Sequence, residues 1–223
     1  DDESETDAID ELDETINVRL TNGINSTING NNPTPIAIID NDAPPTVSFS
    51  GAPYTVAESG TNQLVTVALS AISGKDIAVN YAISDGSTTA GLDYTNVTGT
   101  LTWSSGETGS KTFTIPILDD AWDEDDETLY VTLSSPSNCT VNGSNPTTVT
   151  ILDDDPTPSI AFTNAPYTVD EGCTNAVVSL VLSAQSGRPV YVDYITSDGT
   201  ATNGLDYTSV TGTVIWSTYE TNS

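Results

Sequence analysis

Residues 119–133 read Asp-Asp-Ala-Trp-Asp-Glu-Asp-Asp-Glu-Thr-Leu-Tyr-Val-Thr-Leu and join two patterns. The first nine residues carry seven carboxylates and no cation. The residues that follow alternate, with Leu129, Val131 and Leu133 on one side of an extended chain, as in a half-buried β-strand. An acidic loop that leads directly into a strand therefore organises this part of the chain.

The same pattern recurs along the chain with an offset of 113 residues and without insertion or deletion. Self-similarity at such a period is typical of proteins built from tandem structural units. The recurring motifs are Tyr-Thr-Val-x-Glu (54–58 and 167–171), Ser-Asp-Gly (84–86 and 197–199), Gly-Leu-Asp-Tyr-Thr (91–95 and 204–208), Trp (103 and 216) and Asp-Glu-x-Asp-Glu-Thr (10–15 and 123–128).

The chain is out of phase with its own repeat. Residues 1–42 match the C-terminal part of one unit, residues 43–155 match a complete unit, and residues 156–223 match the N-terminal part of a further unit. These regions are called the N-terminal segment, the middle repeat and the C-terminal segment below. We expect only the middle repeat to close its own core.

Short runs of alternating apolar residues, separated by turn residues, predict the secondary structure of the middle repeat. Strands are expected at 45–50, 53–57, 63–70, 76–83, 97–103, 110–118, 127–133 and 146–152. No run has a helical period. The expected fold class is therefore all-β, with tandem Ig-like antiparallel β-sandwiches of 113 residues each.

The composition limits the partners of the chain. Lys and Arg number 4 against 32 Asp and Glu, for a formal net charge of −28, so we expect no nucleic acid, whose phosphates the chain would repel. No apolar run approaches the roughly 18 residues of a membrane span, so we expect no membrane insertion. The scarcity of Lys favours an extracellular or cell-surface location. Sequons at Asn25, Asn96, Asn138 and Asn142 leave glycans as an open option.

A second acidic run, Asp153-Asp154-Asp155, closes the expected strand at 146–152. Alternate connections of an antiparallel sandwich lie at the same end, so this run should meet the acidic loop at 119–127. Ca²⁺ takes six to eight oxygen ligands from flexible loops and suits such a cluster. Zn²⁺ is disfavoured, because the chain has no His and its two Cys are isolated. The alternative is a solvated acidic turn.

Taken together, these motifs resemble the Calx-β domain, a family that occurs in sodium–calcium exchangers, integrin β4 and giant bacterial surface and adhesin proteins. The resemblance implies a two-sheet sandwich that binds Ca²⁺ at one end. Its pattern implies these ligands in the middle repeat: Glu58, Asp93, Asp119, Asp120, Trp122 through its backbone carbonyl, Glu124, Glu127, Asp153, Asp154 and Asp155. The matching acids in the two partial segments are Asp7, Glu11, Glu14, Asp40, Asp42, Glu171 and Asp206.

Other prominent residues have structural interpretations. Asp85 in its Ser-Asp-Gly motif is expected to cap its own loop, as is its repeat equivalent Asp198. Trp103 and Trp216 follow alternating apolar positions and are expected in the core. Tyr54 and its equivalent Tyr167 are expected to pack there as well.

We expect a non-enzymatic, calcium-binding structural repeat protein that forms an extracellular filament, stalk or adhesin rod. The alternative is a calcium-sensing regulatory or cell-adhesion module of a larger membrane or surface protein. Catalysis by paired carboxylates, as in glycosidases, requires one acid with a raised pKa beside an ionised partner. The acids here are too crowded for that division, and no aromatic cleft surrounds them.

The split phase of the repeat predicts a partner. A sandwich that lacks strands exposes core and open edges, so residues 1–42 of a neighbouring chain are expected to complete residues 156–223 by strand complementation. Such a head-to-tail contact does not close on itself and makes a fibre. The alternative is that the sequence is a window of a longer tandem array. An intermolecular Cys139–Cys173 disulfide fits the fibre, and two free thiols fit either case.

Overall fold

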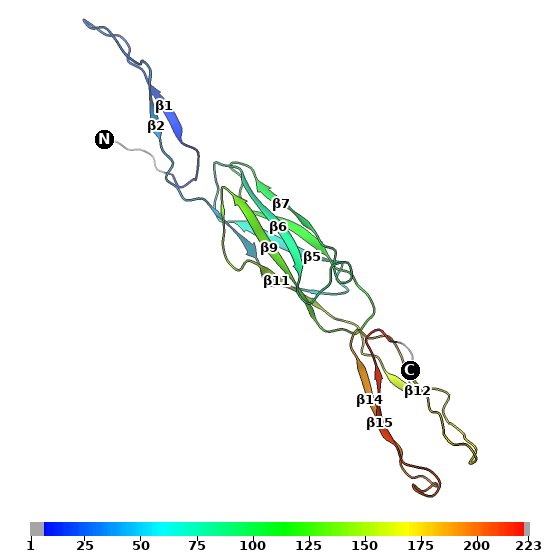
Figure 1. The fold of residues 1–223 in the computed structure, drawn as a ribbon. Coiled ribbons are helices and arrows are strands. Elements are labelled where there is room, and N and C mark those ends of the chain that lie inside the picture. The colour runs from blue at the N-terminus through cyan, green and yellow to red at the C-terminus, as the bar shows by residue number, and fades with distance from the viewer. Residues whose placement is uncertain (1–6, 221–223) are drawn as a thin grey trace. The chain divides into compact units, whose positions relative to one another are not determined.

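The computed structural model describes residues 7–220, and every regular element in that range is a β-strand (Figure 1). The expected all-β fold class is thereby confirmed. Within the same range there is no helix with the length and apolar character needed to cross a membrane. The chain forms two compact units: unit 1 comprises residues 1–55, 62–117 and 128–149, and unit 2 comprises residues 56–61, 118–127 and 150–223.

Unit 1 contains a β-sandwich built from the middle repeat. Its four-stranded sheet has the order β10-β3-β5-β8. The bounds are β3 Thr46–Ser50, β5 Asn62–Leu69, β8 Ser110–Pro116 and β10 Thr140–Val141. Strand β5 is antiparallel to both β3 and β8, whereas the two residues of β10 pair with β3 in parallel.

The five-stranded sheet has the order β4-β11-β9-β6-β7 (Figure 1). The bounds are β4 Tyr54–Ala57, β6 Ile77–Asp85, β7 Thr98–Trp103, β9 Glu127–Ser137 and β11 Thr147–Leu152. Strand β6 is antiparallel to both β7 and β9. The last residues of β4 and β11 belong to unit 2, as do the acidic residues that directly follow these strands.

The core of the sandwich consists of the alternating residues that the sequence pattern indicated. Val65 and Val67 of β5 and Leu129 and Val131 of β9 are completely buried, as is Trp103 at the end of β7. Burying one such aliphatic side chain contributes about 1.5–3 kcal/mol. The eight expected strands correspond to β3–β9 and β11. Strand β10 was not predicted, because two residues are too few to show an alternating pattern of apolar side chains.

The N-terminal segment forms one hairpin, β1 (Glu14–Val18) and β2 (Thr34–Ile38), paired antiparallel. These residues are the repeat equivalents of the first part of β9 and of β11. Their side chains are exposed throughout. The segment therefore reproduces two neighbouring strands of the five-stranded sheet without the rest of that sheet.

The C-terminal segment forms two separate antiparallel pairs, β12 (Ile160–Phe162) with β13 (Leu180–Leu182), and β14 (Val190–Ile195) with β15 (Thr211–Trp216). Trp216 is fully buried, which confirms its prediction as a core residue together with Trp103. Tyr54 is buried as expected, and its equivalent Tyr167 is half-buried. The expected repeat boundaries, at residues 43 and 155, stay a prediction.

Candidate metal centre

The ends of two strands hold the first acids of the centre. Glu58 directly follows β4, and its backbone N–H donates a hydrogen bond of 2.9 Å to the carbonyl of Leu152, the last residue of β11. This bond sets Glu58 beside the acids that follow β11. Although it is a carboxylate, Glu58 is only 5% exposed.

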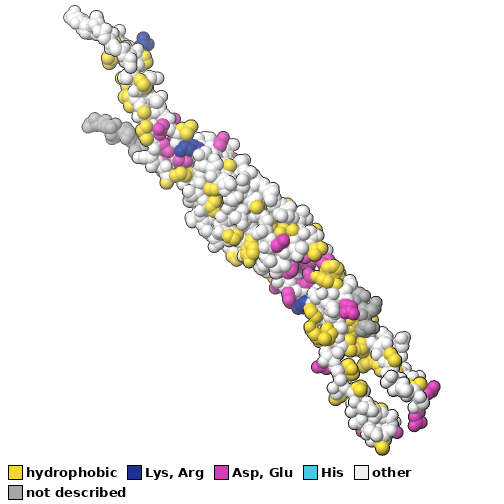
Figure 2. Space-filling model, viewed as in Figure 1, with side chains coloured by type: hydrophobic (Ala, Val, Ile, Leu, Met, Phe, Trp, Pro, Cys, Tyr) yellow, Lys and Arg dark blue, Asp and Glu magenta, His cyan; other side chains and the backbone are white. Residues whose placement is uncertain are grey.

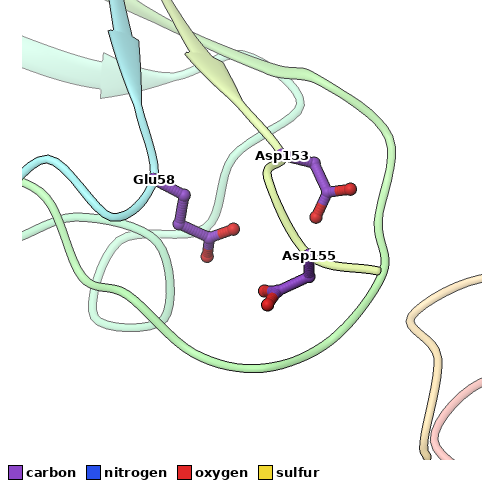
Figure 3. A group of neighbouring side chains, drawn as sticks. All are labelled: Glu58, Asp153 and Asp155. Atoms are coloured by element: carbon purple, nitrogen blue, oxygen red, sulfur yellow. The ribbon is translucent and has the colours of Figure 1, made fainter. Parts of the chain in front are cut away.

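Glu58, Asp153 and Asp155 form one group in which a carboxylate oxygen of each residue lies within 4.8 Å of the others. In Figure 3 the carboxylates of Glu58 and Asp155 point toward one another. Oδ2 of Asp155 is buried and has no hydrogen-bond partner. A buried oxygen without a partner costs free energy unless a cation or donor meets it.

The acidic loop, residues 118–127, supplies the second group of three acids. Glu58, Asp120 and Glu124 again place one carboxylate oxygen each within 4.8 Å of the others. The loop is held by the strand exit, because the backbone N–H of Glu124 donates to Oδ1 of Asp153 over 3.1 Å. In return, the N–H of Asp153 donates to Oδ1 of Asp126 over 3.2 Å. Glu58 is thus shared by both groups.

The crowding of these acids appears in their pKa values. Burial, followed by the charges of Asp120 and Glu124, raises the pKa of Glu58 to about 7. Burial and then the charge of Asp153 likewise raise the pKa of Asp155. In both cases the surroundings disfavour the ionised form, which is the condition that a bound cation relieves.

Five acids, Glu58, Asp120, Glu124, Asp153 and Asp155, therefore fit a divalent cation. No ion pair within residues 7–220 joins Glu58 to Lys or Arg, and the unpartnered oxygen of Asp155 faces the same cluster. All the donors are oxygens, which hard cations with large coordination numbers prefer. The centre fits Ca²⁺, as the sequence predicted.

The other predicted ligands of the middle repeat lie outside these two groups of acids. Asp154 accepts a hydrogen bond from the Ser59 hydroxyl. Asp93, in unit 1, accepts a 2.6 Å bond from the N–H of Thr89 within its own loop. For Asp93, Asp119, Trp122, Glu127 and Asp154 the ligand role stays a prediction.

The acids of the partial segments also stay predictions. Burial and then the charges of Asp7 and Glu14 raise the pKa of Glu11, so acids gather in the N-terminal segment as well. Among the residues that the structure describes, no group of three carboxylates close enough to share an ion includes any of the following: Asp7, Glu11, Glu14, Asp40, Asp42, Glu171, Asp206.

A basic residue reaches the acidic loop, although the loop itself contains no Lys or Arg. Arg188 forms ion pairs with Asp123 and, over 3.2 Å, with Asp125. The buried Ser186 hydroxyl donates to the backbone carbonyl of Asp123 over 3.0 Å, and the N–H of Gly187 donates to the same carbonyl. Asp123 is almost completely buried by these contacts.

The same arrangement occurs a second time, 113 residues earlier. Lys75 pairs with Oδ1 of Asp10 over 2.7 Å, and the buried Ser73 hydroxyl donates to the carbonyl of Asp10 over 3.0 Å. Each set is called a loop–turn cluster below, because it joins an acidic loop to the Ser-Gly-Lys or Ser-Gly-Arg turn of the following repeat. The sequence signal was available, since two of the chain's four basic residues stand at equivalent positions.

The two Ser-Asp-Gly aspartates are loop caps, as predicted. Oδ1 of Asp85 accepts bonds from the N–H of Ala90 and the hydroxyl of Tyr94, over 3.0 and 2.7 Å. Asp198 accepts the equivalent bonds from Asn203 and Tyr207, each within 2.8 Å. These acids are therefore engaged in local structure.

Both cysteines are free thiols in the single chain. Cys139 is buried, and its Sγ donates to the carbonyl of Ala78 over 3.7 Å, whereas Cys173 is exposed. The intermolecular Cys139–Cys173 disulfide stays a prediction, and it would require Cys139 to become accessible.

The fold and the centre define a class of protein: a β-sandwich repeat with an oxygen-only metal centre at the ends of its strands. The Calx-beta domain family matches residues 40–155 and 153–223. The chain therefore belongs to the Calx-beta domain family, as its motifs suggested.

Several known proteins are similar to the chain. The sodium/calcium exchanger Calx of Drosophila melanogaster is 30% identical over 181 residues, which are 80% of this chain and 19% of the exchanger. Sodium/calcium exchanger 2 of Rattus norvegicus is 32% identical over 185 residues, which are 74% of this chain and 20% of the exchanger. The chain thus spans about a fifth of the length of these relatives.

Two solved structures of Calx domains are also similar to the chain. The apo-form Calx CBD1 domain is 31% identical, with a TM-score of 0.48, and the match covers 50% of this chain and 98% of that domain. The calcium binding domain CBD12 of CALX1.1 is 26% identical, also with a TM-score of 0.48, and covers 79% of this chain and 72% of that one.

Proposed function

We propose that this chain is a non-enzymatic, calcium-binding structural repeat of an extracellular filament, stalk or adhesin rod, in which Ca²⁺ stiffens the connection between consecutive repeats. One observation carries the proposal: the metal centre and a loop–turn cluster share the acidic loop, residues 118–127. Asp120 and Glu124 face the centre, and Asp123, between them, is held by Ser186 and Arg188 of the following repeat.

The residues of the loop couple the two features. Without a cation, the carboxylates of Glu58, Asp120 and Glu124 repel one another and favour an open loop. A bound Ca²⁺ would supply the positive charge that allows all three to stay ionised and close together. The loop then keeps one conformation, and in that conformation Asp123 keeps its contacts with the turn of the next repeat.

The extracellular part of the proposal is supported by composition and exposure. The net charge of −28 favours a soluble, cation-rich setting. All four sequon asparagines are exposed: Asn25, Asn96, Asn138 and Asn142. The recurrence of the loop–turn cluster supports the rod, because the same contact can be made at every repeat of a tandem array.

A calcium-sensing regulatory module, or a cell-adhesion module, of a larger membrane or surface protein is the second candidate. The similarity to sodium/calcium exchangers favours the regulatory version. Flanking sequence discriminates the two: membrane spans beside these repeats would favour regulation, and many further repeats would favour a rod.

Calcium titration tests the binding step. Saturation to a hundredfold above Kd should stabilise the folded chain by about 2.7 kcal/mol, which raises Tm by roughly 5–10 °C. Glu58→Gln should lose most of this gain, whereas Asp170→Asn, at an exposed position, should keep it. A Tm that is the same in Ca²⁺ and in EGTA would contradict the proposal.

A second variant tests whether the metal centre is coupled to the loop–turn cluster. Arg188→Ala removes the cation of the loop–turn cluster and leaves Asp123 buried, so amide hydrogen exchange of residues 118–127 in Ca²⁺ should become about tenfold faster. Lys111→Ala is the matched control, because Lys111 pairs with Glu107 outside the cluster. Unchanged exchange in Arg188→Ala would separate the metal centre from the connection between repeats.

A further inference from the structure

Two parts of the chain present apolar strands that nothing covers within residues 7–220. On the core-facing side of β14, Tyr194 is 44% exposed and Val192 is half-buried, whereas their equivalents in the middle repeat, Tyr81 and Val79, are half-buried and completely buried. On β1 and β2, Ile16, Ile36 and Ile38 are exposed. Figure 2 shows hydrophobic side chains in yellow at the surface along both hairpins. Exposed apolar strands with open edges mark interaction surfaces.

The middle repeat contains the interface that these two surfaces would make. Strand β9 pairs with β6 there, with Tyr81 opposite Leu133, Ala82 opposite Thr132 and Ile83 opposite Val131. The repeat equivalent of β6 is β14, and the equivalent of β9 begins at β1. In the described residues β14 pairs only with β15, so the edge that β9 occupies in the middle repeat is open.

The register of the middle repeat brings one pair of opposite charges together. With the register of the middle repeat, Arg19 lies opposite Ile195 and diagonal to Asp193. Arg19 makes no ion pair within the described part of the chain, unlike Lys75, Lys111 and Arg188. Opposite charges at such cross-strand positions stabilise strand pairing. Arg19 thus has an acidic neighbour only in the paired state.

We propose that residues 14–38 of a second copy of this chain occupy the open edge of β14, with Leu20 opposite Tyr194, Arg19 opposite Ile195 and Val18 opposite Thr196. The hairpin β1–β2 then takes the place that β9 and β11 hold in the middle repeat. This pairing rests on the proposed function and extends it, because it identifies a second copy of the chain as the partner from which a rod would be built.

Single-cysteine chains test the pairing and its register. In a Cys139→Ala, Cys173→Ser background, one copy carries Arg19→Cys and the other carries Ile195→Cys. Mixed and oxidised in Ca²⁺, the two should form a disulfide-linked heterodimer. Thr15→Cys replaces Arg19→Cys in the control, since it lies on the same face but about 13 Å further along the strand, and it should link at least tenfold less.

Sedimentation of the unmodified chain keeps the test valid if the cysteine variants fold poorly. The weight-average mass should rise with concentration, and Arg19→Glu should weaken association about tenfold or more through repulsion from Asp193. Asp193→Arg in the same chain should restore it. A monomer at all concentrations overturns the proposal, and so does equal linking at positions 15 and 19, which indicates unspecific apolar contact.

Calorimetry of Ca²⁺ binding on the same samples separates this inference from the proposed function. The substitutions lie outside the acidic loop and the residues of the metal centre. A chain that binds Ca²⁺ but stays monomeric refutes only the pairing. A chain that pairs in the expected register but does not bind Ca²⁺ refutes only the calcium-dependent connection.

Discussion

The middle repeat and the C-terminal segment have the same motifs in the same order but differ in structure. Val65 of β5 is completely buried, whereas its equivalent Val178 is 51% exposed. The Tyr-Thr-Val motif at 54–56 lies in β4, but the same three residues at 167–169 form no strand. Local sequence is nearly constant between the two regions, so it does not decide the outcome.

The difference follows from which partner strands are present. Strand β4 neighbours β11, and most of β5 pairs with β8. The C-terminal segment has no described equivalent of β8 or β11, and there only Leu180–Leu182 of the β5 equivalent is a strand, paired with β12. Strand formation in this chain therefore depends on cross-strand neighbours rather than on the single strand.

The test with the largest expected effect compares substitutions at two equivalent positions of the repeat. Leu129→Ala in β9 should lower the free energy of unfolding by roughly 2–5 kcal/mol, because it leaves a cavity in a closed core. Ile16→Ala, at the equivalent position of β1, should cost under about 0.5 kcal/mol, because Ile16 is 51% exposed. Chemical denaturation at low protein concentration measures both, and equal losses would mean that the partial segment is packed like the complete one.

The second test compares Glu58 with its exposed equivalent Glu171. The pKa of Glu58 is raised from 4.5 to about 7 in the folded protein, so the folded state binds a proton that the unfolded chain releases. In calcium-free buffer the stability from this proton is present below pH 4.5 and is lost as pH rises to about 7. The loss is about 3 kcal/mol.

Denaturation curves across this pH range give the result. Glu58→Gln should flatten the loss, and Glu171→Gln should leave it unchanged. Saturating Ca²⁺ should remove the loss as well, because binding favours the ionised carboxylate. A wild-type profile that is flat without Ca²⁺ would show that the acids of the centre are not crowded.

The smallest effect concerns two equivalent glycines. A Cβ on Gly99 would lie 2.6 Å from the hydroxyl of Tyr81, and a Cβ on Gly212 would lie 2.5 Å from that of Tyr194. Tyr81 is stacked on Phe113 with ring centroids 3.8 Å apart, whereas Tyr194 is exposed and has room to move. Gly99→Ala should cost about 1–3 kcal/mol, and Gly212→Ala less than half of that. Melting curves of the two variants give the comparison, and similar losses would indicate that Tyr194 is as confined as Tyr81.

The sequence predicted the strands and core of the middle repeat, because alternation is a local property that burial enforces. It also indicated that the runs around Asp120 and Asp153 meet, since alternate loops share one end of a sandwich. The sequence did not predict the contacts of Asp123 with Ser186 and Arg188. Those residues lie 63 or more positions away, and the charge of each acidic run was counted without regard to distant residues. The role of Glu58 as a metal ligand was predicted only from the family resemblance.

The open apolar edge of β14 has a consequence for the synthesis of such a protein. In a repeat of this kind, roughly fifty residues separate the last early strand from the end of the strand that completes the sheet, which at about 5–20 residues per second is several seconds of translation. During that time the β6–β7 hairpin of the middle repeat, the equivalent of β14–β15, has its aliphatic side chains in water. Dense negative charge keeps such intermediates apart through mutual repulsion, so the acidity of the chain protects its assembly before it serves the finished molecule.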